Sequence, residues 1–202
     1  MKDIDMRDNT TICYYDNNAE EYFKRTIHAD IQNEYDVFLG KLKPGARIID
    51  LGAGSGRDIK YFKSKGFKVD GIDASEEMCI LATKYSGVDV ELKCIQEWNP
   101  RGTYDGIWAN ASLLHLKKDE CLNFLQCIHL YLNVGGIAYV SLKKGKGSAY
   151  DSEGRFFAKY NRDTILIMLS QCARIKLLEI WESQDSLSRI DTQWISFIVQ
   201  KV

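Results

Sequence analysis

From residue 46 onward, short apolar runs alternate with longer segments whose apolar residues recur every three or four positions. The first pattern predicts buried strands and the second predicts amphipathic helices. Strands are expected at 46–50, 67–72, 89–94, 104–109 and 136–142, and helices at 55–65, 75–85, 118–132 and 161–172. Strands that alternate with helices in this way predict right-handed crossovers, and therefore an α/β fold with a mostly parallel sheet covered on both faces.

The two ends of the chain depart from this alternation. Residues 1–43 are polar and helix-compatible, which predicts an N-terminal helical cap. Residues 44–202 would form the rest of a single structural domain, beginning at a Pro-Gly turn. Near the C-terminus, the strand-like runs 176–182 and 193–200 have only a loop between them, so we expect them to pair antiparallel.

Composition narrows the function classes. The chain has 202 residues, 45% of them hydrophobic, and a net charge of −1, which gives no basic footprint for nucleic acid. The basic run Lys143–Lys146 is expected to be a solvated loop. No apolar run of about 18 residues and no signal-peptide core is present, so we expect a cytoplasmic protein without a membrane partner. Six cysteines form no Cys-x-x-Cys pair, and we expect no metal site.

A glycine-rich turn follows the first predicted strand. It reads Asp50-Leu51-Gly52-Ala53-Gly54-Ser55-Gly56 and leads into a predicted helix. Glycines at such a turn let the backbone approach a ligand closely, and the helix that follows offers free N–H groups. Asp73 ends the second predicted strand, where a carboxylate is placed to hold two ribose hydroxyls. Together these features predict a nucleoside-containing cofactor.

The spacing of the glycines separates the candidate cofactors. In the dinucleotide fingerprint the third glycine would stand at Arg57, but here it comes one place earlier, at Gly56. This loop, with Asp73 behind it, resembles motif I and the acidic motif II of class I S-adenosylmethionine-dependent methyltransferases. Residues 104–115, which read Tyr-Asp-Gly-Ile-Trp-Ala-Asn-Ala-Ser-Leu-Leu-His, are similar to motif IV of small bacterial members of the tellurite-resistance type and of methyltransferase domain types 11 and 25.

The resemblance covers roughly residues 44–202 and implies a doubly wound, Rossmann-like sheet of seven strands. The implied strand order is 3-2-1-4-5-7-6, with the antiparallel hairpin at one edge. The implied cofactor is S-adenosyl-L-methionine. Its expected contacts are Asp50, Gly52, Ala53, Gly54, Gly56, Asp73, Ala74, Ile95, Gln96, Ala109, Asn110 and Tyr22.

A smaller set of residues is expected to meet the methyl acceptor. His115 is placed to act as a general base, and the alternative is a packed loop histidine. Tyr15, Arg25 and Arg155 are candidate acceptor contacts, with ordinary surface positions as the alternative for both arginines. Residues 143–154 are rich in glycine, lysine and serine, so we expect a mobile loop that closes as a lid.

These features predict an enzyme that moves the sulfonium methyl group to an oxygen, nitrogen or sulfur atom of a small molecule by in-line attack. The absence of a basic bias favours a small-molecule acceptor over nucleic acid. Two alternatives remain open. One is a module that binds S-adenosylmethionine without catalysis of its own, and the other is an oxidoreductase with a nucleotide cofactor.

Overall fold

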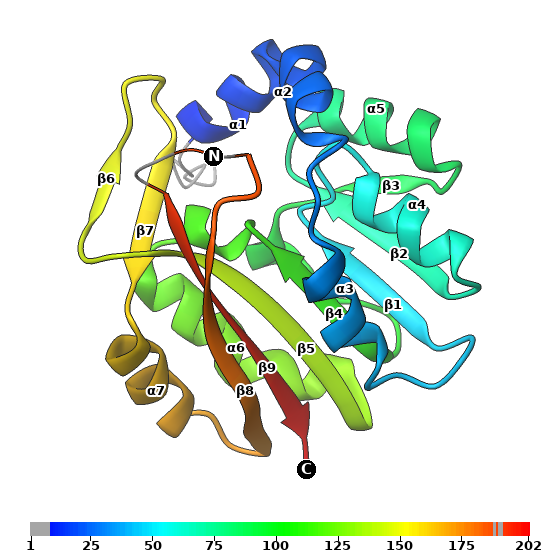
Figure 1. Cartoon of the computed structure of the whole chain (residues 1–202), viewed down its shortest axis with the longest axis vertical. Coiled ribbons are helices and arrows are strands. Elements are labelled where there is room, and N and C mark those ends of the chain that lie inside the picture. The colour runs from blue at the N-terminus through cyan, green and yellow to red at the C-terminus, as the bar shows by residue number, and fades with distance from the viewer. Residues whose placement is uncertain (1–8, 188, 190–191) are drawn as a thin grey trace, which may run out of the picture.

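In the computed structural model, residues 9–187, 189 and 192–202 are described (Figure 1). The helices are α1 (Asn9–Asn17), α2 (Ala19–Thr26), α3 (Gln32–Leu39), α4 (Arg57–Ser64), α5 (Glu76–Ser86), α6 (Lys118–Tyr131) and α7 (Arg162–Ser170). Short 3-10 turns lie at Ile95–Glu97 and Leu113–His115. The strands are β1 (Arg47–Leu51), β2 (Lys68–Asp73), β3 (Val90–Leu92), β4 (Tyr104–Asn110), β5 (Leu132–Lys144), β6 (Ser148–Tyr150), β7 (Phe156–Tyr160), β8 (Ile175–Gln184) and β9 (Gln193–Lys201).

Five parallel strands form the centre of the sheet, in the order β3-β2-β1-β4-β5. β9 pairs antiparallel with β5, and β8 pairs antiparallel with β9. With β8 and β9 counted as the sixth and seventh strands of the expected fold, the predicted order 3-2-1-4-5-7-6 and the C-terminal hairpin are confirmed. Helices α1 to α3 precede the sheet, as predicted. The domain division after residue 43 stays a prediction, and residues 1–8 lie outside the described residues.

The segment after β5 differs from the expected mobile loop. β5 continues to Lys144, and β6 and β7 form an antiparallel hairpin in which Tyr150 pairs with Phe156. β7 also pairs in parallel with the end of β5. The Asp151 carboxylate stabilises the hairpin turn because it accepts hydrogen bonds from the backbone N–H groups of Glu153 and Arg155. The prediction of a solvated loop is therefore wrong at Lys143, which is a half-buried strand residue.

Side chains alternate between the two faces of the central strands. On the face toward α3 and α4, Trp108 and Tyr139 stack with ring centroids 4.0 Å apart and pack with Phe38 and Phe62. On the opposite face, neighbours such as Ala109 join the core formed with α6 and α7. Because both faces are covered by helices, the central strands are apolar on both sides. This is why they appear in the sequence as short continuous apolar runs.

Helices α1 and α2 lie across the carboxyl ends of the parallel strands (Figure 1). On one side, the Ser75 hydroxyl at the start of α5 donates a hydrogen bond to the Asp16 carboxylate of α1. On the other side, α1 contacts the β6–β7 hairpin through Thr10 and Thr11. Among the described helices, none has the length and the apolar character that crossing a bilayer requires.

Gly56, the last glycine of the glycine-rich turn, packs directly against the backbone of α5. Its φ is +74°, and an added Cβ would come 2.8 Å from the Cα and carbonyl oxygen of Ala82. Gly66 has a φ of +86° with nothing within 4 Å of an added Cβ. Gly66→Ala should therefore cost about 1–2 kcal/mol of unfolding free energy, the strain of a left-handed residue. Gly56→Ala should cost about 1–3 kcal/mol more, because the backbones of α4 and α5 must move apart.

Urea unfolding of the two variants measures this difference. Equal losses for Gly56→Ala and Gly66→Ala would show that the turn does not depend on close contact with α5.

Candidate functional site

The site lies where one face of the sheet changes from apolar to polar. Trp108 of β4 pairs in register with Tyr139 of β5, and both belong to the core under α3. Two residues further along, the register pairs Asn110 with Ser141, and Ser141 with Ser196 of β9. These polar residues stand at the carboxyl ends of the parallel strands, which is where open α/β sheets bind ligands.

Two adjoining cavities open at this edge, of about 220 Å³ and 150 Å³. We call them the larger and the smaller chamber. Both are lined by Tyr15, Tyr22, Gly52, Asn110 and His115, so they meet at these residues. The larger chamber extends toward β5 and the β8–β9 turn, and the smaller one extends toward the ends of β2 and β3.

Asp73 fixes the glycine-rich turn at the smaller chamber. One of its carboxylate oxygens accepts a hydrogen bond of 2.8 Å from the Gly54 N–H, and the other accepts one of 3.0 Å from the Ser75 N–H. Each oxygen keeps a lone pair for a further donor. Burial raises the pKa of Asp73 above its usual range, although the backbone hydrogen bonds oppose the shift. The carboxylate is thus oriented to accept hydrogen bonds from hydroxyl groups in this chamber.

Gly54 has a left-handed φ of +52°, and an added Cβ would lie 3.6 Å from the Tyr22 ring. The space between the turn and Tyr22 is therefore a narrow slot. Ala111, at the end of β4, also has a positive φ, of +57°. Left-handed backbone at a residue other than glycine is strained, and such strain clusters at functional sites.

A buried carboxylate, Asp58, lies beneath the larger chamber. It accepts hydrogen bonds from the Tyr35 hydroxyl at 2.5 Å, from Arg57 Nε at 2.6 Å and from Trp108 Nε1 at 2.7 Å. Asn110 Nδ2 lies 3.4 Å from the same carboxylate. Burial opposes ionisation, but the Arg57 guanidinium and the hydrogen bonds hold the pKa of Asp58 below its usual range. Three segments of the chain, α3, the start of α4 and β4, thus meet at one negative charge.

Asp50 lies on β1 below the glycine-rich turn and is almost fully buried. Its Oδ2 has no hydrogen-bond partner among the described residues. Burial, together with the nearby charge of Asp58, raises the pKa of Asp50 well above its usual range. A buried acceptor without a partner is costly, so a donor placed above the turn would be favourable here.

His115 connects α1 to the β6–β7 hairpin. Its Nδ1 lies 2.7 Å from the carbonyl oxygen of Phe156, and its Nε2 lies 2.9 Å from the Tyr15 hydroxyl. Because a carbonyl oxygen only accepts, Nδ1 carries the proton and Nε2 accepts from Tyr15. Burial lowers the pKa of His115 to about 4, so the imidazole is neutral at pH 7.

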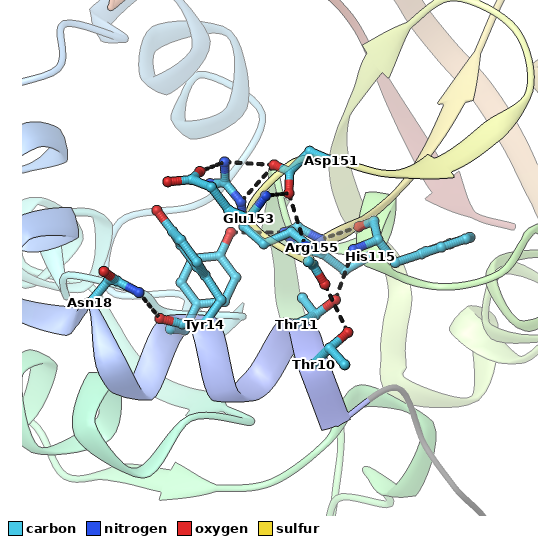
Figure 2. Close-up of polar contacts among 11 residues, drawn as sticks. Thr10, Thr11, Tyr14, Asn18, His115, Asp151, Glu153 and Arg155 are labelled. Carbon is cyan, nitrogen blue, oxygen red and sulfur yellow. Dashed lines mark hydrogen bonds and ion pairs between the residues drawn. The ribbon is translucent and has the colours of Figure 1, made fainter.

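The hairpin and α1 together cover the chambers. Figure 2 shows Thr10 and Thr11 of α1 pointing toward the hairpin. The Thr10 hydroxyl donates a hydrogen bond of 2.8 Å to the Gly154 carbonyl, and the Phe156 N–H donates one of 2.9 Å to the Thr11 hydroxyl. Arg155 forms ion pairs with Asp151 and Glu153 of the same hairpin.

Comparison with known proteins identifies the family. A family model described as a methyltransferase domain matches residues 23–190, a span that contains the glycine-rich turn, Asp73 and residues 104–115. The chain belongs to the class I S-adenosylmethionine-dependent methyltransferases. This confirms the predicted family and the predicted cofactor. The narrower resemblance to tellurite-resistance-type members stays a prediction. No curated protein sequence matches the chain.

Solved structures share the fold of this methyltransferase at low identity. The 1,6-didemethyltoxoflavin-N1-methyltransferase of Burkholderia thailandensis, solved with its acceptor and S-adenosylhomocysteine, is 19% identical with a TM-score of 0.75, over 96% of this chain and 89% of that one. The magnesium protoporphyrin IX methyltransferase of Synechocystis PCC 6803, solved with S-adenosylmethionine, is 15% identical with a TM-score of 0.72 over all of both chains. The [4+2]-cyclase SpnF is 18% identical with a TM-score of 0.65, over 84% and 80%. At these identities the likeness shows the fold.

The two chambers of the methyltransferase bring most of the predicted site residues together. Of the expected cofactor contacts, those that line a chamber are Tyr22, Gly52, Ala53, Gly54, Asp73, Ala74, Ile95, Gln96 and Asn110. The expected acceptor residues Arg25 and Arg155 line the larger chamber, and Tyr15 and His115 line both. Asp50, Gly56 and Ala109 line neither, because Asp50 lies under the turn, Gly56 packs on α5, and Ala109 faces the opposite side of β4.

Sequence reasoning missed part of the larger chamber. Its lining also includes Tyr139, Ser141 and Lys143 of β5 and Trp194 of β9. A signal was present, because Tyr139, Ser141 and Lys143 alternate with apolar residues, as expected where one face of a strand leaves the core. Among the described residues, no group of three histidine, cysteine or acidic side chains is placed to hold a metal ion.

The Asp58 network predicts a large loss of stability when its charge is removed. Asp58→Asn leaves the buried Arg57 without its partner, so the unfolding free energy should fall by about 3–5 kcal/mol. Asp70→Asn is the control, because Asp70 pairs with Arg47 at the surface and should contribute less than about 1 kcal/mol. Urea unfolding of both variants measures the effect, and equal losses would contradict a structural role for the network.

The lowered pKa of His115 predicts a pH-dependent stability. Since the folded-state pKa of about 4 lies below the ordinary value of 6.5, the stabilisation is present above pH 6.5 and is lost as the pH falls toward 4. His115→Gln removes this titration. Between pH 7 and 4.5, the unfolding free energy of the wild type should fall by about 2 kcal/mol more than that of the variant.

The exposed His28 supplies a control for the substitution itself, since His28→Gln replaces a histidine that lines neither chamber. Parallel curves for wild type and His115→Gln would show that His115 is not held neutral by the fold.

Proposed function

We propose that this methyltransferase transfers the methyl group of S-adenosylmethionine to an oxygen, nitrogen or sulfur atom of a small molecule by in-line attack. The observation that carries the proposal is the pair of chambers that meet at Tyr15, Tyr22, Gly52, Asn110 and His115. The smaller chamber has the features of a nucleoside site, and the larger chamber is lined by polar and aromatic groups. A cofactor and an acceptor would then face each other at the shared residues.

The smaller chamber suits the adenosine part of the cofactor. The Asp73 carboxylate has free lone pairs for the two ribose hydroxyls, and Ala74 adjoins it. Ile95 and Gln96 border the far end, where their backbone groups are placed to frame the adenine. The buried hydroxyl of Ser112, which has no hydrogen-bond partner among the described residues, is a further group facing this chamber.

The slot under Tyr22 suits the methionine part of the cofactor. Gly54 brings the backbone close to the Tyr22 ring, and a side chain on residue 54 would fill this space. The partnerless oxygen of Asp50 beneath the turn would favour a hydrogen-bond donor above it, and a cationic amino group of the methionine part could supply that donor. Arg25, on α2, lies in the same wall with its guanidinium 5.5 Å from the Tyr22 ring centroid and is placed to receive the methionine carboxylate.

The larger chamber would hold the acceptor. When bound, the cofactor supplies an electrophilic methyl group on its sulfonium sulfur. The chain contributes alignment of the acceptor and exclusion of water by α1 and the β6–β7 hairpin, and orientation of this kind can lower a barrier by roughly 7–11 kcal/mol. The family fold and the chamber size favour a small molecule, and the expected location in the cytoplasm stays a prediction.

We propose that His115 acts mainly as a positioning residue. Its neutral ring with a pKa of about 4 is a weak base, and its Nε2 is already engaged by Tyr15. The hydrogen bond holds the Tyr15 hydroxyl at the border of the two chambers, where it can orient the acceptor. These contacts favour the packed loop histidine, the alternative to a general base, as the role of His115.

Calorimetric titration with S-adenosylmethionine, S-adenosylhomocysteine and NAD tests the proposal, together with transfer of a labelled methyl group to a metabolite extract. We expect both sulfur compounds to bind and label to appear in a small molecule. Binding without any transfer would favour the binding-module alternative, and tight binding of NAD alone would favour an oxidoreductase.

Asp73→Ala should weaken binding of S-adenosylhomocysteine by about 1.5–3 kcal/mol, because the variant loses charge-assisted hydrogen bonds to the ribose. Asp70→Ala is the matched control on the same strand, since Asp70 pairs with Arg47 and lines neither chamber. Calorimetry measures both dissociation constants. An unchanged constant for Asp73→Ala would mean that the ribose lies elsewhere.

A further inference from the structure

Lys143 places a cationic side chain in the larger chamber, close to the point where the two chambers meet. It follows Ser141 by two residues on β5, so both lie on the same face of the sheet. Ser141 pairs in register with Asn110, and the rise and spacing of strands then place the Cα of Lys143 about 8 Å from that of Asn110. A small molecule bound to Lys143 would therefore extend to Asn110, one of the residues that line both chambers.

The other described cations that line this end of the larger chamber already have acidic partners. Arg155 pairs with Asp151 and Glu153, and Arg189 pairs with Asp185 at 2.6 Å. Lys143 is different, because no described residue forms an ion pair or a hydrogen bond with its ammonium group. Its described contact is the Phe157 ring, with Nζ 3.3 Å from the centroid.

The surroundings of Lys143 would stabilise a negative charge. Burial and the positive charges of Arg189 and Arg155 lower its pKa to about 8, while Asp151 opposes and Lys159 adds to the shift. A half-buried ammonium without a hydrogen-bond acceptor is unfavourable. An anion beside it would accept its hydrogen bonds and offset its repulsion with Arg155 and Arg189. Arg25 also has no ion-pair partner among the described residues, but it is exposed and lies at the Tyr22 side of the chamber.

Aromatic side chains also line the larger chamber. Phe157 lies under the Lys143 ammonium, Trp194 is the register partner of Lys143 on β9, and Tyr139 lies four residues earlier on β5. Trp194 is held in place because its Nε1 donates a hydrogen bond of 2.8 Å to the Asp185 carboxylate. Flat rings stack or pack edge-on against such groups.

We infer that the methyl acceptor is a small aromatic carboxylate whose carboxylate group binds the Lys143 ammonium. This inference rests on the proposed function and names the substrate class of the same site. Of the described cations that line this end of the larger chamber, Lys143 alone has no acidic partner, and its one ammonium matches the single charge of a carboxylate. The ring of the acceptor would lie beside Phe157 and Trp194, with its nucleophilic atom directed toward Asn110 and the cofactor.

Benzoate and benzamide form a matched pair of probes, because they differ in charge but hardly in shape. We expect protein saturated with S-adenosylhomocysteine to bind benzoate at least tenfold more tightly than benzamide, as measured by ligand-observed NMR titration. Lys143→Met should abolish this preference, and Lys143→Arg should restore it. Lys144→Met is the control, since Lys144 pairs with Glu182, lines neither chamber and should leave the preference unchanged.

Equal affinity of the wild type for benzoate and benzamide, including no binding of either, would overturn the inference. So would a benzoate preference that survives in Lys143→Met. The proposed function is tested separately in the same samples, because all four proteins should bind S-adenosylhomocysteine with dissociation constants within about twofold of one another. Loss of that binding in the wild type would contradict the proposed function itself.

Discussion

The geometry of the site depends on one buried negative charge. The Asp58 carboxylate lies at the start of α4 and receives hydrogen bonds from Tyr35 of α3, from Arg57 and from Trp108 of β4. These donors come from three separate stretches of the chain, so the carboxylate sets where each stretch can lie. Since the glycine-rich turn ends directly before Arg57, the same contacts also fix the turn against the end of β4. A buried charge is tolerated here because it is surrounded by donors and a guanidinium.

A second constraint shapes the chambers from above. α1 is connected to the β6–β7 hairpin by Thr10 and Thr11, to the loop after β4 by the Tyr15–His115 hydrogen bond, and to α5 by Asp16. These contacts join segments that are more than 50 residues apart in sequence. The result is a partly covered space over the sheet edge, with the proposed nucleoside site in the smaller chamber and a polar, aromatic lining in the larger one.

The sheet could be predicted from the sequence because the residue pattern that specifies each strand and turn lies within that segment. The apolar runs of the central strands alternate along the chain with helices and glycine-containing turns. Between 176–182 and 193–200 no helix was predicted, so these two strands had to pair antiparallel. The glycine-rich turn and Asp73 could also be identified from the sequence, because both belong to one β-α-β unit. This part of the fold and of the proposed cofactor site needed no long-range information.

The rest depends on contacts between distant segments, which periodicity does not report. The hairpin after β5 contains only a three-residue and a five-residue strand, and its stability comes from Asp151 in the turn and from α1. Lys143 looked like part of a solvated basic run because its face of the sheet becomes a chamber only when β9 and the hairpin are in place. His115 was recognised as a site residue, but its tautomer follows from the Phe156 carbonyl, 41 residues away.

A crystal structure of the protein with S-adenosylhomocysteine would test the central claim most directly. The account predicts the adenosine in the smaller chamber, the ribose hydroxyls on the Asp73 carboxylate, and the sulfur facing the larger chamber between Gly52 and Asn110. Adenosine bound in the larger chamber, or a smaller chamber that stays empty with the ligand bound elsewhere, would contradict it.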